Sequence, residues 1–204
     1  MYYDFAEMKP SAIYYCMMQT LIPRPIAWVL SENENSTYNL APFSYFNAVC
    51  SDPPLVMISV GKKPDGSDKD TRVNIEQRRD FIIHIASENM LDPVNDSAES
   101  LAAGISEVDR LGLVTTEWEG SRLPRLTDCD IAYACHCYDI LEIGDAKQSL
   151  ILGQVDSVYV NDDVMGHDDK GRPKTMADKV NPLGRLGAGE YMSFGRVLKR
   201  DRPV

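Results

Sequence analysis

The chain has 204 residues, which is enough for one well-buried domain and too few for two comfortable ones. Hydrophobic residues make up 44% and charged residues 25%, a composition typical of a globular protein and not of a disordered one. With 31 acidic and 21 basic side chains the formal net charge is -10. Such a surface repels phosphodiester backbones and anionic lipids, so we expect neither nucleic-acid binding nor membrane binding.

The N-terminus and the cysteines indicate the cellular compartment. Residues 1–7 contain no basic region followed by an apolar stretch, so we expect no secretory signal. No apolar run approaches the roughly 20 residues needed to span a bilayer. Five cysteines, an odd number with irregular spacing, favour reduced thiols over a disulfide framework. We therefore expect a cytoplasmic protein.

The first half of the chain predicts one helix followed by strands. An apolar stripe predicts a helix over residues 11–19, and the prolines that follow end it. Residues 26–30 and 38–46 predict two strands of a hairpin. Trp28 could form the wall of a ligand site or fill the core of the domain, and we expect the second. The continuous apolar run 55–60 predicts a strand buried on both faces.

The second half alternates strands with polar segments. A strand is predicted at residues 81–85, and an exposed helix, kinked at its proline, at residues 87–103. Two long strands are predicted at residues 131–141 and 150–160, each with alternating polarity. We expect the polar segment 161–181 to form an excursion loop or lid.

A last short strand is predicted at residues 191–197. The chain contains no internal repeat and no convincing linker, so we expect residues 1–204 to form a single domain. Many strands with few helices at this length predict a mainly β fold built as a closed or partly closed barrel.

Residues 41–54 (APFSYFNAVCSDPP) place hydroxyls and amides between aromatic rings, directly before the strand at 55–60. A flavin requires this combination, because its ring needs flat apolar surfaces and its polar edge needs hydrogen-bond donors. A strand with a polar turn and no ligand explains the same pattern.

Residues 61–74 (GKKPDGSDKDTRVN) hold four cations in an otherwise acidic protein. Lys69 and Arg72 flank a predicted helix N-terminus at Asp70 or Thr71, where free N–H groups and the helix dipole favour an anion. A phosphate monoester would fit there, and a solvated loop is the alternative. Neither a Walker loop nor a Gly-x-Gly-x-x-Gly fingerprint is present, which argues against P-loop and Rossmann folds.

Four segments carry a resemblance to a known family: RPIAWV at 24–29, NLAPFSYFNAVCSDPPLVMISVG at 39–61, KDTRVNI at 69–75 and PLGRLGAGEY at 182–191. In this order and spacing the chain resembles the flavin reductase-like FMN-binding split-barrel family. Flavoredoxin and the reductase components of two-component flavin monooxygenases belong to it. The resemblance implies a mainly β, Greek-key split β-barrel with a few peripheral helices.

The resemblance also implies an FMN site and a homodimer with two interfacial flavins. Its residues would line the flavin ring and ribityl chain, border them from the next strand, hold the phosphate, and close the pocket. The ring and ribityl chain would be lined by Ser44, Tyr45, Phe46, Asn47 and Ala48, and bordered from the next strand by Ser59, Val60 and Gly61. The phosphate would be held by Lys69, Asp70, Thr71 and Asn74, and the pocket would be closed by Arg185, Leu186, Gly187 and Tyr191.

At one position the chain departs from the family pattern. Many relatives have a histidine that approaches the flavin just before the strand equivalent to residues 150–155, and Gln148 stands there in this chain. Glutamine donates and accepts hydrogen bonds but does not titrate, so nicotinamide binding and proton handling at this position stay open.

The function implied is that of an FMN-dependent oxidoreductase, either an NAD(P)H:flavin reductase or a flavoprotein oxygenase component. Hydride would pass from the nicotinamide to flavin N5, and no protein residue would be catalytic because the cofactor carries the chemistry. A monooxygenase or electron-transfer protein would be a partner. The alternatives are a non-enzymatic FMN electron-transfer or redox-sensing protein, and a barrel with no ligand.

Other candidate residues predict structural roles. The side chains of Cys135 and Cys137 point away from that of His136 on a strand, so we expect no metal site there. His84 lies in an apolar strand and is expected to be a hydrogen-bonded core residue. Glu107 is expected to be a surface charge, as are Asp109 and Glu117.

Overall fold

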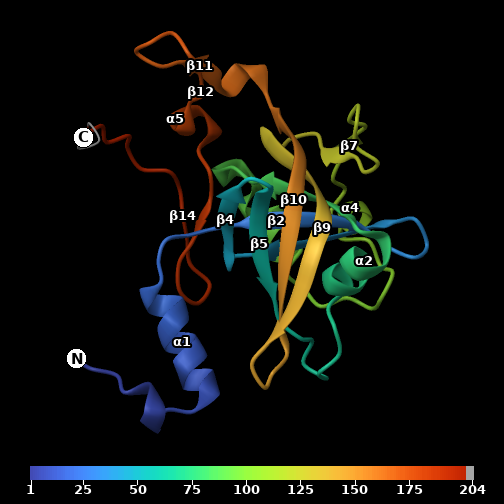
Figure 1. The fold of residues 1–204 in the computed structure, drawn as a ribbon, viewed down its shortest axis with the longest axis vertical. Helices are drawn as coiled ribbons and strands as arrows, with labels where there is room; N and C mark the ends of the chain where they lie inside the picture. Colours follow the sequence, from blue (N-terminus) through green and yellow to red (C-terminus); the bar gives the residue numbers. More distant parts are fainter. Residues whose placement is uncertain (201–204) are drawn as a thin grey trace.

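The computed structural model describes residues 1–200, and its centre is a seven-stranded antiparallel sheet (Figure 1). The strand order is β3-β2-β6-β9-β10-β5-β4, so consecutive strands sit at both edges and the two longest lie inside. The strands are β2 (Ala27–Glu32), β3 (Tyr38–Phe43), β4 (Phe46–Ser51), β5 (Pro54–Val60), β6 (Asp80–Ile85), β9 (Ile131–Ile143) and β10 (Gln148–Val160).

The sheet curls because β9 and β10, with 13 residues each, pair through two irregularities in register, at Leu152/Gly153 and between Val155 and Ser157. Such bulges increase the twist and bend of a strand. A Cβ at Gly153 would lie 2.4 Å from Cζ of Phe81, so only glycine lets the Phe81 ring lie across the bulge. The ring belongs to the core on that face of the sheet.

Both faces of the sheet are covered. On β2 the side chains alternate: Val29 packs with Phe81, Ile151 and Ile75 of helix α2 (Asp70–Arg78) on one face. Trp28 packs with a second cluster on the other face, under two short helices. Those helices are α3 (Leu91–Asp96) and α4 (Glu107–Arg110). Trp28 is fully buried, which confirms its predicted place in the core.

Helix α1 (Pro10–Thr20) projects from the curled sheet and buries none of its residues (Figure 1). Next to α1 lies a small three-stranded sheet of β1 (Arg24–Pro25), β13 (Gly184–Arg185) and β14 (Tyr191–Met192), with β13 in the middle. No helix within residues 1–200 is both long enough and apolar enough to cross a membrane. The remaining elements are η1 (Phe5–Glu7), η2 (Glu88–Met90), β7 (Thr115–Thr116), β8 (Arg125–Leu126), η3 (Asp162–Val164), β11 (Met165–His167), β12 (Pro173–Thr175) and α5 (Ala177–Val180).

The helix predicted at residues 87–103 was wrong in extent, because η2 and α3 end at Asp96. Pro93 lies within the first turn of α3, where a missing N–H costs no helical hydrogen bond. Ser97 ends the helix: its hydroxyl donates to the Val94 carbonyl oxygen at 3.0 Å and accepts from the Trp28 indole N–H at 2.9 Å. A distant indole therefore helps to fix the end of the helix.

Three strand predictions need correction. The strand predicted at 38–46 ends at Phe43, and β4 begins after a bend at Ser44 and Tyr45. The strand predicted at 191–197 shrinks to Tyr191–Met192. The run at 55–60 is not buried on both faces, because Met57 and Ser59 are half-exposed. The polar segment 161–181 is not a bare loop but folds into η3, the β11–β12 hairpin and α5.

The core histidine is confirmed. His84 is fully buried, its Nδ1 donates to the Trp28 carbonyl oxygen at 3.1 Å, and its Nε2 accepts the Leu126 N–H at 2.9 Å. Burial lowers the pKa of His84 to about 4, so the ring is neutral at physiological pH. On β9, His136 faces outward and pairs with Asp156, while both neighbouring cysteines are buried, as strand alternation predicts.

Candidate functional site

Two adjoining cavities meet at Ser44, Tyr45, Ser59 and Gln148, which line both of them. The first, which we call the basic cavity, has a volume of about 400 Å³ and includes Lys62 and Lys69. The second, the apolar cavity, has a volume of about 600 Å³. Its further lining residues are Met17, Leu21, Pro23, Arg24, Pro25, Phe46, Asn47, Met57, Ile143 and Leu150.

The four shared residues are held by main-chain and side-chain hydrogen bonds. The bend between β3 and β4 is fixed to β5, because the Ser59 N–H donates to the Tyr45 carbonyl oxygen at 2.9 Å. Gln148 begins β10, and its Nε2 donates to Ser59 Oγ at 3.0 Å. A Cβ at Gly61 would lie 3.3 Å from Gln148 Oε1, so the glycine leaves room for this amide.

Lys69 is the cation of the basic cavity that has no carboxylate partner within residues 1–200. Lys62 pairs with Asp68 at 2.6 Å and Lys63 with Asp70 at 2.9 Å. The Lys69 ammonium lies 5.6 Å from the centre of the Phe43 ring, and burial lowers its pKa. An anion bound beside it would restore a partner for this desolvated charge.

Lys69 is also the N-cap of α2, and its side chain does not cap the helix. The first intrahelical hydrogen bonds come from the N–H groups of Arg72 and Val73, which both donate to the Lys69 carbonyl oxygen. The N–H groups that precede them, with the positive end of the helix dipole, add to the attraction for an anion.

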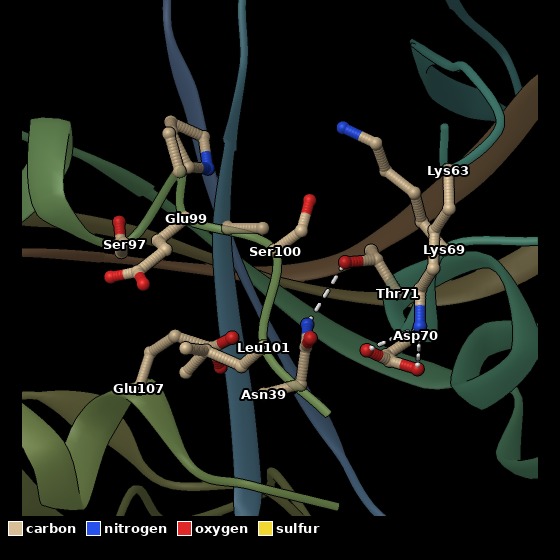
Figure 2. Close-up of a pocket in the computed structure, with 13 residues that line it drawn as sticks. Asn39, Lys63, Lys69, Asp70, Thr71, Ser97, Glu99, Ser100, Leu101 and Glu107 are labelled. Carbon is tan, nitrogen blue, oxygen red and sulfur yellow. Dashed lines mark hydrogen bonds and ion pairs between the residues drawn. The ribbon is translucent and has the colours of Figure 1, made fainter. Parts of the chain in front are cut away.

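The other residues predicted to hold a phosphate turn away from the basic cavity. A neighbouring cavity of about 60 Å³ shares Lys69 with it and contains Asp70 and Thr71 (Figure 2). Figure 2 shows the Lys63 ammonium against the Asp70 carboxylate, whereas the Lys69 side chain extends away from that pair. Thr71 Oγ1 accepts a hydrogen bond from Asn39 Nδ2 at 2.9 Å.

Asn74 has a structural role in this chain. Its Nδ2 donates to Asn33 Oδ1 at 2.9 Å and to Ser31 Oγ at 3.2 Å, which ties α2 to β2 and the turn that follows it. The side chain is buried and lines neither of the two main cavities. The Asn74 side-chain NH₂ group, which the sequence predicted to bind a phosphate, is therefore already hydrogen-bonded within the chain.

Glu107 was predicted at the surface, and this prediction was wrong. The residue is buried beside the 60 Å³ cavity, and its Oε2 accepts the Leu40 N–H at 2.9 Å. Burial raises the pKa of this carboxyl. The Glu107 carboxyl group joins α4 to β3 and lines the same small cavity as Lys69 (Figure 2).

The structure brings together eight of the seventeen predicted site residues around the two cavities. These are Ser44, Tyr45, Phe46, Asn47, Ser59, Gly61, Lys69 and Gln148. Val60 turns into the core and Ala48 lies exposed along the edge strand. Arg185 and Tyr191 stack on each other, 4.3 Å from guanidinium carbon to ring centre, and line neither cavity in the single chain.

Sequence reasoning missed the contribution of α1 and of Arg24. Tyr14 and Met18 line the basic cavity, Met17 lines the apolar one, and Arg24 lies beneath Ser44. Arg24 opens the RPIAWV motif, which was the available signal. Its role was hidden because its partners lie elsewhere in the chain.

The residues present fit a flavin with a phosphate tail. Tyr45 Oη is buried and has no hydrogen-bond partner within residues 1–200, and burial raises its pKa, so it is a neutral donor facing this region. The apolar cavity offers flat hydrophobic walls, and the basic cavity offers Lys69 for a phosphate. FMN carries both kinds of group.

Comparison with known proteins supports this assignment. The model of the flavin reductase like domain matches residues 18–176. An uncharacterized protein of Halalkalibacterium halodurans is 33% identical over 195 residues, which cover 94% of this chain and 91% of the relative.

Two solved structures are similar over nearly their whole length. Nitrilotriacetate monooxygenase component B from Bacillus cereus superposes with a TM-score of 0.88 at 28% identity, and the match covers 98% of each chain. A protein with a split barrel domain from Shewanella frigidimarina gives a TM-score of 0.83 at 13% identity, covering all of both chains. The second likeness establishes the fold, which is the predicted mainly β split barrel. The chain belongs to the flavin reductase-like family.

Proposed function

We propose that this protein binds FMN across the basic and apolar cavities and is an NAD(P)H-dependent flavin reductase, the reductase component of a two-component oxygenase. The observation that carries the proposal is the half-buried Lys69 ammonium, which lacks a carboxylate partner within residues 1–200. It stands beside a helix N-terminus in a protein of net charge -10. Its likeness to a monooxygenase component B supports the same function.

In this proposal Lys69 and the first turn of α2 hold the phosphate. Ser44, Tyr45 and Gln148 supply hydrogen-bonding groups where the two cavities meet, and Phe46 and Met57 provide apolar surface. A flavin bound there would supply the hydride- and electron-transfer chemistry. The chain itself binds and orients the ring and shields it from water.

We further propose that the active form is a homodimer. Leu21 and Ile143 line the apolar cavity, yet they are 56% and 52% exposed in the single chain. A second subunit that covers them would also enclose the ring and bring its own closing segment near the cavity.

All five cysteines are free, which supports a cytoplasmic location.

Binding of FMN to the purified protein, measured by quenching of flavin fluorescence, tests the proposal. Lys69→Glu replaces the phosphate partner with a like charge, so we expect the Kd for FMN to rise about tenfold or more. Lys170→Glu makes the same charge change in the turn between β11 and β12, away from both cavities, and should leave the Kd within about twofold. An unchanged Kd in Lys69→Glu would contradict the proposed phosphate site.

Gln148 favours a second candidate, an FMN electron-transfer protein that receives electrons from a partner protein. Its amide bonds Ser59 and cannot titrate, so it supplies no proton at the meeting point of the cavities. Steady-state oxidation of NADH or NADPH with added FMN separates the two functions. Turnover supports the reductase, and bound flavin without turnover supports the electron carrier.

A further inference from the structure

Arg24 is a deeply buried cation with no carboxylate within ion-pair distance among residues 1–200. It is 3% exposed, and neutral oxygens accept all its observed hydrogen bonds. Nη1 donates to the carbonyl oxygens of Met18 at 2.8 Å and Leu21 at 2.6 Å, and Nη2 donates to that of Leu186 at 2.7 Å. Nε donates to Ser44 Oγ at 3.2 Å.

These contacts join three segments that are remote in sequence. Met18 and Leu21 belong to the C-terminal end of α1, whose last carbonyl groups lack intrahelical partners and carry the negative end of the helix dipole. Leu186 follows β13, and Ser44 lies in the bend between β3 and β4. Only the fork of a guanidinium reaches all of them at once, because a lysine offers a single nitrogen.

The contact with Ser44 fixes the direction of its hydroxyl. A hydroxyl oxygen that accepts from a cationic N–H directs its own hydrogen elsewhere, and no acceptor within residues 1–200 receives the hydrogen of Ser44. Ser44 lines both cavities, so that hydrogen is available to a ligand.

We propose that Arg24 is a positioning residue, which makes Ser44 a dedicated hydrogen-bond donor to an acceptor atom of the flavin ring. This inference rests on the proposed function, because it assumes that a flavin occupies the cavities. Arg24 lines the apolar cavity, but Nε, Nη1 and Nη2 of its guanidinium each already donate to an oxygen of this chain. It acts on the ligand through Ser44, whose hydroxyl its Nε orients.

A double-mutant cycle on FMN affinity tests the coupling. Ser44→Ala removes the donor, and Arg24→Met removes the group that orients it, so we expect each to raise the Kd about tenfold. The double variant should bind about as weakly as either single variant, because both changes remove the same hydrogen bond. Arg122→Met is the matched control: Arg122 is an exposed arginine paired with Glu32 and Asp80, so its loss should leave the Kd within about twofold.

Independent losses that multiply to about a hundredfold in the double variant would overturn the proposal, as would an unchanged Kd in Arg24→Met. If Arg24→Met does not fold, Arg24→Lys keeps the charge but loses the fork. In that background Ser44→Ala should cause no further loss, and a further tenfold loss would also overturn the proposal. The absorption bands of the bound flavin should shift alike in both single variants, which a merely structural role for Arg24 does not produce. Absence of FMN binding in the unaltered protein would instead contradict the proposed function.

Discussion

At the scale of single residues, the side chains predicted to hold a phosphate fall into two groups: one faces a cavity, and the others are already hydrogen-bonded within the chain. Lys69 has no carboxylate partner within residues 1–200 and faces a cavity, whereas Asn74 and Thr71 are already bonded to Asn33 and Asn39. The sequence places all three in one short segment and cannot show which hydrogen bonds are already made, because the partners come from the β2–β3 hairpin. Local pattern predicts the residue types of a site better than their orientation.

Arg24 illustrates the same limit. A basic residue between two prolines ahead of a strand gives no reason to expect a buried hydrogen-bonding centre. Its partners at Met18, Leu21 and Leu186 are carbonyl oxygens, which every residue has, so the sequence carries no signal for them. Only the three-dimensional arrangement identifies the role.

His84 gives a pH dependence at this scale. In the unfolded chain the imidazole takes up a proton below about 6.5, but in the folded protein burial lowers the pKa to about 4. Between these values the unfolded state binds more protons, so the free energy of unfolding should fall as the pH drops through this window. The full loss is about 3 kcal/mol, at about 1.4 kcal/mol per unit of pKa.

Urea denaturation between pH 7 and pH 4 measures this loss, and an NMR titration of the ring measures the pKa of His84 directly. His84→Gln should remove this component of the pH dependence, although it also lowers stability at pH 7 by disturbing two buried hydrogen bonds. A His84 resonance that titrates near 6.5 in the folded protein would refute the assignment.

At the scale of elements, segments with a clear local pattern were predicted well, among them the helix at 11–19, which is α1 (Pro10–Thr20). The short apolar run 81–85 and the alternating segment 150–160 both became strands at nearly the predicted positions. The helix at 87–103 was wrong because its end depends on the contact between Ser97 and Trp28, which are far apart in sequence. The bend at Ser44 was missed for a similar reason, since a backbone bond to Ser59 fixes it.

The bulge in β10 carries a prediction about packing. Gly153→Ala adds a methyl group that would lie 2.4 Å from the Phe81 ring, and the buried ring has no room to retreat. We expect a loss of about 1–3 kcal/mol in the free energy of unfolding, measured by chemical denaturation. Gly195→Ala adds the same group where no atom of residues 1–200 lies within 4 Å, and should change stability by less than about 0.5 kcal/mol. Equal effects in the two variants would show that Phe81 does not require the glycine.

At the scale of the whole molecule, the net negative charge and the partly open cavities both act against tight binding of an anionic ligand. A net charge of -10 repels an anionic ligand at long range. The proposed affinity for FMN would therefore come from local groups such as Lys69 and from exclusion of water. The single chain leaves the apolar cavity partly open, with Leu21 and Ile143 in contact with solvent. A second subunit over this opening would supply the missing wall.

If the homodimer forms there, its assembly and FMN affinity should be linked. Wild-type protein should sediment at twice the chain mass of 22.8 kDa at micromolar concentration. Ile143→Asp places a charge in the proposed interface, so we expect a shift toward the monomer and an FMN Kd raised about tenfold. Leu198→Asp makes a matched change at a side chain that is 76% exposed and lines neither cavity, and should alter neither property. A wild-type chain that stays monomeric at every concentration while binding FMN would mean that one subunit builds the complete site, because nothing from a partner would then be needed to hold the ring.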